Sequence, residues 1–159
     1  MQVVSNSSPL CYLMLIDQIH LLPMMFKEVF VPEAVVRELC DGGAPNIVRE
    51  WIARPPRWLR VQKPAGEPDP QLERLHAGER EVILLARGIK ADLVVMDEKA
   101  ARRLAREQDL RVTGLIGILD EAATRGLVDL LTAVEHLRQT NFRASPHLLK
   151  MLLDRHYSR

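Results

Sequence analysis

Short apolar runs that alternate with helical segments constrain the fold of this chain more than any other feature of its sequence. The runs that favour strands lie at residues 2–5, 29–31, 58–62, 93–96 and 111–113. In the segments between them, apolar residues recur three or four positions apart, as they do on one face of a helix. Helical connections make successive strands parallel and cover both faces of the sheet. The sequence therefore predicts an α/β fold, in three α/β/α layers with a central parallel sheet.

Capping and breaking residues set the expected bounds of the helices. Ser8 can cap a helix that begins at Pro9. Pro32 can begin another helix, which the glycines at 42–43 end. The expected helices cover residues 9–17, 18–25, 32–40, 46–53, 78–87, 98–108, 116–124, 127–139 and 145–156. At 159 residues the chain has the length of one ordinary domain, so we expect a single domain over 1–159.

The three helices expected after residue 116 carry apolar residues at helical spacing, and such residues need a surface to cover. They are Leu119, Ala122, Ala123, Leu130, Leu131, Val134 and Leu137. We therefore expect this C-terminal part to belong to the domain and not to form a tail.

Charge and cysteine content narrow the class of protein. The 22 basic and 21 acidic side chains give a net charge of +1, so the chain is not a polycation that coats nucleic acid. Cys11 and Cys40 form no metal-spaced pair, and we expect two buried free thiols in a reducing, cytoplasmic compartment. Polar residues interrupt the apolar stretch 9–26 and the N-terminus lacks a signal-peptide pattern, so we expect no membrane segment.

Four polar positions lie where an α/β protein is expected to bind a ligand, which is beyond the carboxyl ends of the parallel strands. Asn6 follows the first strand, Asp97 follows the fourth, and Glu79 begins a helix. Glu38 lies one helical turn after Ala34, so a carboxylate stands beside an apolar row. Ordinary explanations stay open for three of them. Asn6 suits a turn and Asp97 suits a helix cap. Glu79 suits the first turn of a helix, where the helix dipole stabilises an acidic side chain.

Several segments of the chain together resemble the PIN-domain family, and in particular its VapC-like toxin branch. Residues 5–10, Ser-Asn-Ser-Ser-Pro-Leu, are similar to that branch's opening Ser-Asn/Asp-Thr-Ser-Pro-Leu. Residues 141–145, Asn-Phe-Arg-Ala-Ser, are similar to its Gly-Phe-Arg-x-Ser joint. The other matching segments, in the family's order, are 31–39, 78–83, 91–98 and 112–117. No single motif is specific, but the ordered set indicates the family.

The resemblance implies a PIN-like α/β/α fold and metal-dependent cleavage of RNA by an acidic quartet. By position in the motifs, the catalytic and metal-binding residues are Asn6, Glu38, Glu79 and Asp97. The implied cofactor is Mg2+ or Mn2+, hard ions that prefer oxygen ligands. Additional candidates within the same motifs are Ser8, Glu81, Glu98 and Thr113.

Two positions of the implied quartet involve a choice. Glu79 and Glu81 differ by about 200° of helix rotation, so we do not expect both to face one ion. Glu79 is preferred because the run from it to Asp97 aligns with the family without a gap. Asn6 stands where an acid is usual, and its amide oxygen brings no charge and cannot act as a base. The expectation is a weak endoribonuclease, and the alternative is a catalytically silent PIN-like binding module.

The resemblance also implies an RNA substrate, a small antitoxin protein and a second copy of the chain as partners. Arg102 and Arg103 follow Asp97 and are the candidates for RNA contact, unless they form an ordinary solvated helix face. Arginines and two tryptophans interleave in 49–60, as in an RNA-binding surface or in a surface helix whose Trp rings pack inward. The bulky apolar run 21–26 suits either an interface or the core.

Overall fold

The computed structural model describes residues 1–157, in which five strands form one parallel sheet in the order β3-β2-β1-β4-β5. The strands are β1 Val3–Ser5, β2 Val29–Val31, β3 Leu59–Val61, β4 Leu93–Val95 and β5 Val112–Thr113. Each of the five expected strands is confirmed to within a residue at either end. Val4 of β1 pairs with Phe30 of β2 on one side and with Val94 of β4 on the other, so β1 is central.

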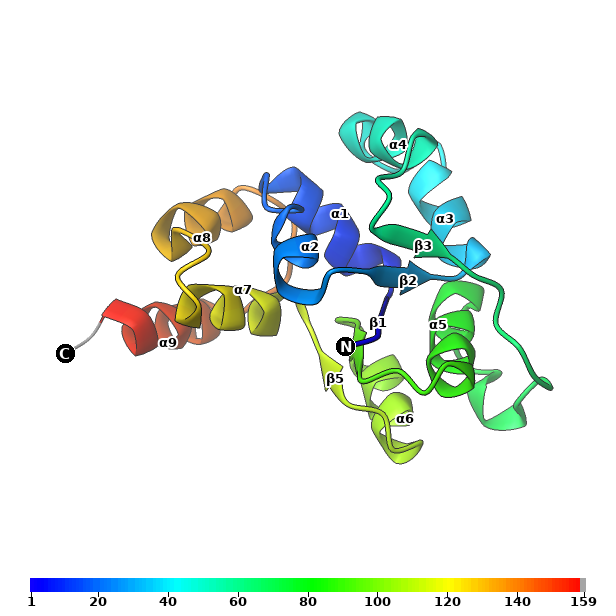
Figure 1. The fold of residues 1–159 in the computed structure, drawn as a ribbon. Coiled ribbons are helices and arrows are strands. Elements are labelled where there is room, and N and C mark those ends of the chain that lie inside the picture. Colours follow the sequence, from blue (N-terminus) through cyan, green and yellow to red (C-terminus); the bar gives the residue numbers. More distant parts are fainter. Residues whose placement is uncertain (158–159) are drawn as a thin grey trace.

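Nine helices and one short 3-10 turn accompany the strands in the described part of the chain. They are α1 Ser7–Leu15, α2 Leu21–Phe26, α3 Glu33–Cys40, α4 Asn46–Ala53, η1 Pro70–Leu72, α5 Ala77–Gly88, α6 Lys99–Glu107, α7 Leu115–Thr124, α8 Leu130–Arg138 and α9 Pro146–Tyr157. Figure 1 shows α1, α3 and α4 above the strands and α5 and α6 below them, which gives the three expected layers. At one side of the molecule, α7 and α8 contact both α1 and α9.

The first helix begins earlier than expected. Asn6 follows β1 directly, and its backbone N–H donates to the carbonyl oxygen of Val95 on β4, 2.9 Å away. Asn6 is the N-cap, so α1 begins at Ser7 and Ser8 lies inside the first turn. The expected capping role of Ser8 is therefore wrong. Pro9 fits in the first turn because the N–H groups there have no partner within the helix.

The C-terminal helices share the hydrophobic core of the sheet, as expected from their apolar spacing. The buried members of that set are Leu119, Ala122, Leu130, Val134 and Leu137. Ala123 is half-buried, and Leu131 is 53% exposed, since it follows buried Leu130 by 100° of rotation. Two leucines of α9 also join the core. Asp120 of α7 holds the end of α9 through His156, whose Nε2 lies 2.7 Å from Asp120 Oδ1.

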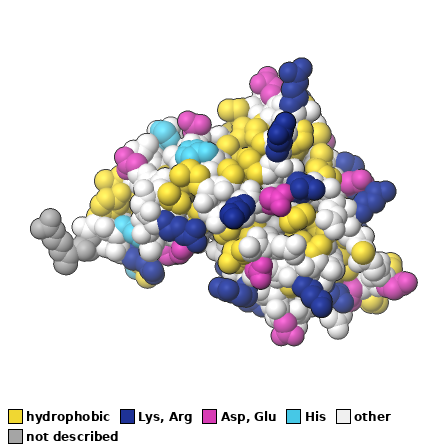
Figure 2. All heavy atoms as spheres, in the orientation of Figure 1, with side chains coloured by type: hydrophobic (Ala, Val, Ile, Leu, Met, Phe, Trp, Pro, Cys, Tyr) yellow, Lys and Arg dark blue, Asp and Glu magenta, His cyan; other side chains and the backbone are white. Residues whose placement is uncertain are grey.

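The surface carries charges of both signs. Figure 2 shows Lys, Arg, Asp and Glu side chains interspersed over one face, in keeping with the net charge of +1. Trp51 and Trp58 pack on each other, with ring centroids 6.0 Å apart, and against the core. This supports inward packing for the tryptophans of 49–60. In the run 21–26 only Met24 is exposed, so most of that run belongs to the core.

The two cysteines differ in their exposure to solvent. Cys11 is half-buried, but Cys40 is exposed, so the expectation of two buried thiols is wrong. Cys40 ends α3 and follows buried Leu39, so its side chain turns outward. Over residues 1–157, every helix is too short or too polar to cross a membrane.

The strand order places a crevice beside β1. From β1 the chain continues to β2 and β3, which lie on one side of β1 within the sheet. It then crosses to β4 and β5 on the other side of β1. The connections that follow β1 and β4 therefore diverge, and the carboxyl ends of these strands frame the place where open sheets bind ligands. Asn6 follows β1 here, and Asp97 comes just after β4.

Candidate metal centre

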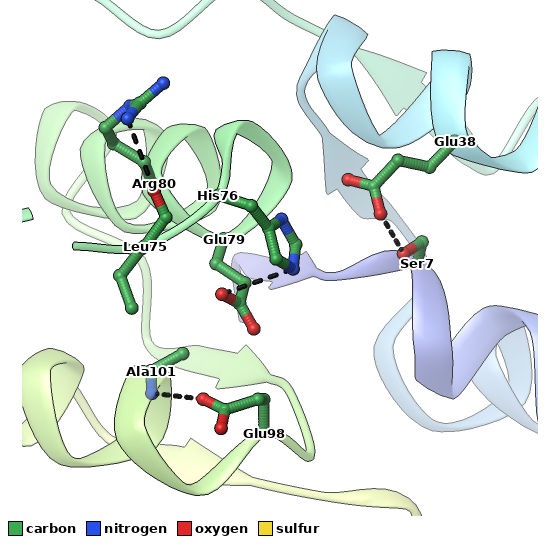
Figure 3. A network of polar contacts seen from close by, with 8 residues as sticks. All are labelled: Ser7, Glu38, Leu75, His76, Glu79, Arg80, Glu98 and Ala101. Atoms are coloured by element: carbon green, nitrogen blue, oxygen red, sulfur yellow. Dashed lines mark hydrogen bonds and ion pairs between the residues drawn. The ribbon is translucent and has the colours of Figure 1, made fainter. Parts of the chain in front are cut away.

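A hollow of about 820 Å³ lies beyond the carboxyl ends of β1, β4 and β5. The residues predicted to form the site all line it: Asn6, Glu38, Glu79 and Asp97. They come from the end of β1, from α3, from the first turn of α5 and from the end of β4. Figure 3 shows the carboxylates of Glu38 and Glu79 reaching from α3 and α5 toward the space in which Glu98 also lies. The fold thus brings together polar positions that lie far apart in the sequence.

The side chain of Glu38 is positioned from two sides. Ser7 Oγ donates a hydrogen bond to Glu38 Oε2 at 2.9 Å, while Oε1 is buried without a hydrogen-bond partner (Figure 3). Gly78 at the start of α5 lies against it, and a Cβ at this position would overlap Glu38 Oε1. The glycine therefore leaves the space that the carboxylate occupies.

Asp97 is held by the backbone at the start of α7. The N–H of Leu115 donates to Asp97 Oδ1 at 2.9 Å, and Oδ2 is buried without a partner. Gly114 makes room for the carboxylate, because a Cβ there would overlap Oδ1. Burial raises the pKa of Asp97, against the opposing effects of the Leu115 N–H and the nearby Arg102 guanidinium.

The residue that caps α6 is Glu98 and not Asp97. Glu98 is the N-cap, and its Oε2 accepts a hydrogen bond from the N–H of Ala101 at 2.8 Å (Figure 3). The interpretation of Asp97 as a helix cap is therefore wrong, since its carboxylate accepts from α7 instead. Glu98 also lines the hollow and adds a further carboxylate at its edge.

Glu79 is a buried carboxylate, with 4% of the residue exposed. His76 Nε2 lies 3.2 Å from Glu79 Oε1, and the imidazole itself is 59% exposed. Burial raises the pKa of Glu79 and the charges of Glu98 and Glu38 raise it further, whereas His76 lowers it. A cation among these carboxylates would relieve both the burial cost and the repulsion.

Asn6 contributes an uncharged oxygen to the hollow. Its Oδ1 is buried without a partner, as are Glu38 Oε1 and Asp97 Oδ2. A buried polar atom left in this state costs roughly 1–3 kcal/mol, and coordination to a hard cation would satisfy it. The donor set therefore fits Mg2+ or Mn2+. In the described residues 1–157, no three Asp, Glu, His or Cys side chains lie close enough to share an ion as they stand, so binding requires side-chain rotation.

Of the additional candidate site residues, some line the hollow and one does not. Ser8 and Thr113 line the hollow, and Thr113 lies against Gly117, where a Cβ would overlap its Oγ1. Glu81 lies elsewhere and forms an ion pair with Arg37, at 3.6 Å. The geometry thus favours Glu79 as the residue of α5 that faces the hollow.

The two arginines that are candidates for RNA contact also differ in position. Arg102 lines the hollow beside Asp97, and its Nε is buried without a partner. Arg103 does not line this hollow, because successive residues of a helix point about 100° apart. It pairs with Glu107 at 3.4 Å and lines a separate hollow between η1 and α6.

Four residues that shape the hollow were not predicted from the sequence. Gly78 and Gly114 lie inside the matching segments 78–83 and 112–117, and Gly78 directly precedes Glu79, which was the available signal. Ser7 lies inside the matching segment 5–10, whereas His76 lies outside all of these segments. The contacts of these two residues with Glu38 and Glu79 appear only when the helices are packed together.

Comparison with known proteins identifies the family. A family model described as a PIN domain matches residues 2–158, which is nearly the whole chain. Searches of curated proteins and of solved structures found no match. PIN domains have a nuclease-type fold and are generally metal-dependent nucleases. The parallel sheet with carboxylates gathered at its strand ends agrees with that description. This chain belongs to the PIN domain family.

Proposed function

We propose that the protein is an endoribonuclease that uses Mg2+ or Mn2+ held by Asn6, Glu38, Glu79 and Asp97. The observation that carries the proposal is that three of these residues line one hollow and each has a buried oxygen without a hydrogen-bond partner. The fourth, Glu79, is a buried carboxylate beside other carboxylates, which is an unfavourable arrangement unless a cation neutralises it.

The residues of the hollow have distinct roles in this proposal. A bound cation supplies Lewis acidity, which activates water and offsets charge on the scissile phosphate. The Glu79 carboxylate lines the same hollow and would accept the proton of the attacking water. His76, close to Glu79 Oε1 and largely exposed, gives that proton a route to solvent. Arg102 offers a guanidinium to a phosphate oxygen at the same hollow.

Asn6 weakens the proposed centre without removing it. An amide oxygen can coordinate Mg2+ or Mn2+, but it adds no negative charge, so three carboxylates must supply the attraction. We therefore propose one resident ion, with a second entering mainly with the substrate phosphate. If a negative charge at position 6 were indispensable, the chain would be a catalytically silent PIN-like binding module.

The decisive experiment compares two carboxylates of α5 that differ in direction. Glu79 faces the hollow and Glu81 pairs with Arg37, so Glu79→Gln should lower Mn2+ affinity in titration calorimetry while Glu81→Gln should not. Cleavage of a labelled RNA should follow the same order and should stop in chelator. Equal cleavage in chelator, or equal Mn2+ affinity in the two variants, would refute the metal mechanism.

The variant Asn6→Asp separates the nuclease from the silent module. It should strengthen Mn2+ binding and increase a cleavage that the wild type already shows. If only Asn6→Asp cleaved RNA, the silent binding module would replace the nuclease.

The proposed biological role is the toxin of a VapC-like toxin and antitoxin pair in the cytoplasm, acting as a homodimer. Its support is the resemblance of residues 5–10 to the opening motif of that branch, together with free cysteines suited to a reducing compartment. Exposed Met24 offers an apolar contact for a partner. Light scattering that showed only monomer, and failure to copurify a small protein encoded beside this gene, would contradict the role.

A further inference from the structure

A second hollow opens next to the candidate metal centre. Its volume is about 910 Å³, and it lies between α1, α3 and the loop that precedes α4. Six residues line both hollows, among them Tyr12, Glu38 and Asn141. The two hollows therefore form one continuous groove, with Tyr12 at their junction.

Part of the wall of the second hollow is aliphatic and lies beside the ring of Tyr12. Leu15, Leu39 and Ala44 line it, and Leu15 is 37% exposed. The ring of Tyr12 packs edge-on against Phe142 with centroids 5.0 Å apart, and its hydroxyl donates to Asn141 Oδ1 at 2.7 Å. A fixed aromatic ring beside an open aliphatic wall suits a flat apolar ligand.

Acidic side chains outnumber Lys and Arg in the second hollow, which disfavours a phosphate and favours an uncharged ligand with N–H donors. Within residues 1–157, Arg37 is the one Lys or Arg that lines it, and Arg37 pairs with Glu81. The carboxylates of Glu38 and Asp41 also line it and accept hydrogen bonds. A nucleobase has this chemistry, because its ring is apolar on both faces and carries N–H donors along its edge.

We propose that the second hollow is a nucleobase subsite, which receives one unstacked base of an RNA strand while the adjoining phosphate lies at the metal centre. The inference rests on the proposed function. The groove has a candidate metal centre beside an apolar hollow, and a nucleotide has a charged phosphate beside a flat apolar ring. A base within a duplex is paired and stacked and does not reach such a hollow. The substrate is therefore single-stranded at this nucleotide, and Tyr12 is the residue that positions its base.

The first test fills the hollow. Ala44→Trp places an indole there from a half-buried loop position outside the metal centre. Ile47→Trp adds the same group at an exposed position of α4 and is the matched control. Affinity for a short fluorescein-labelled oligoadenylate is measured by anisotropy in Mn2+. Ala44→Trp should weaken it about tenfold, the scale of one base–aromatic stack. Its Mn2+ affinity should be unchanged, and Ile47→Trp should behave as wild type.

The second test removes the base. Nucleotides of the same RNA are replaced by abasic ones, one position at a time, and at one position the wild type should lose about tenfold in affinity. That abasic RNA should bind Ala44→Trp with no additional loss, as two changes at one contact do. The wild-type series decides the matter even if Ala44→Trp does not fold.

The outcomes separate the subsite from the nuclease. An RNA affinity unchanged by Ala44→Trp, as expected if the hollow holds a segment of another protein, would overturn the subsite. Equal wild-type affinity for every abasic RNA would overturn it as well. A base-dependent affinity without any cleavage on a gel would sustain the subsite and refute the nuclease. Cleavage without a base-dependent affinity would sustain the nuclease and refute the subsite.

Discussion

Replacing Gly78 with Ala should displace the Glu38 carboxylate without unfolding the protein. A Cβ at this position overlaps Glu38 Oε1, and the flexible Glu38 side chain can rotate away from it. That rotation breaks the hydrogen bond from Ser7 and takes the carboxylate out of the hollow. Gly88, the last residue of the same helix, is the matched control. A Cβ there would meet only the carbonyl oxygen of Ala65, at 3.8 Å.

The two variants should differ little in the absence of metal. Ala is about 0.5–1 kcal/mol more stable than Gly within a helix, and 1 kcal/mol corresponds to about 2–4 °C in Tm for a chain of this size. Gly88→Ala should therefore raise the metal-free Tm by about 1–4 °C. Gly78→Ala has the same helix gain but loses a hydrogen bond, so its metal-free Tm should stay within about 4 °C of the wild type.

Thermal unfolding with Mn2+ separates the variants. At about 100 times the wild-type Kd, metal stabilises the folded state by about 2.7 kcal/mol, or about 5–11 °C in Tm. Losing the orientation of one ligand costs up to about 100-fold in affinity, which reduces this gain to about 0.4 kcal/mol, or about 1–2 °C. Gly88→Ala should keep the full gain. An equal Mn2+-dependent gain in both variants would refute the assignment of Glu38 as a ligand.

Three other changes test the charge and the packing of the molecule. Asp97→Asn should abolish Mn2+ binding and raise the metal-free Tm, because burial raises the pKa of Asp97 and so penalises its charged form; a lower metal-free Tm would contradict this. The raised pKa values of Asp97 and Glu79 mean that the folded state binds protons more tightly than the unfolded state. Their contribution to stability is therefore full below the ordinary pKa values and is lost as pH rises through the raised ones. The stability gained by Asp97→Asn, measured by urea unfolding without metal, should grow from acidic to neutral pH, and a constant gain would count against the argument. Deleting residues 140–159 uncovers the core that Leu149 and Leu152 complete, at about 1.5–3 kcal/mol for each leucine. The shortened protein should be insoluble or much less stable, and a wild-type Tm would show that α9 is dispensable.

The five strands and most of the helices were predictable because they are short and keep one apolar pattern, whereas η1 was not predicted and α2 and α8 begin three residues later than expected. Residues 93–96 form an apolar run between Asp92 and Asp97, and β4 occupies that run almost completely. The three C-terminal helices were predictable for the same reason, since their apolar residues repeat at helical spacing and find the core. The start of α1 was not, because a bond from Asn6 to the neighbouring strand, and not a local capping signal, decides it.

The candidate site was predictable as a set of residues but not as a geometry. Helix rotation alone separates Glu79 from Glu81, but only packing decides which of them faces the hollow. Asp97 had a local explanation as a cap, and the structure replaces it with a bond to Leu115, 18 residues further along the chain. Contacts of this kind depend on how distant elements meet, so no local pattern carries them.

The main chain at Asn6 is fastened to β4 independently of the side chain. Its N–H bonds the carbonyl oxygen of Val95, so the sheet sets the path of the backbone while the side chain sets only the charge offered to the hollow. Asn and Asp have nearly the same shape, and exchange between them leaves the scaffold intact. A single substitution at position 6 can therefore change the charge of the hollow while the backbone keeps its path.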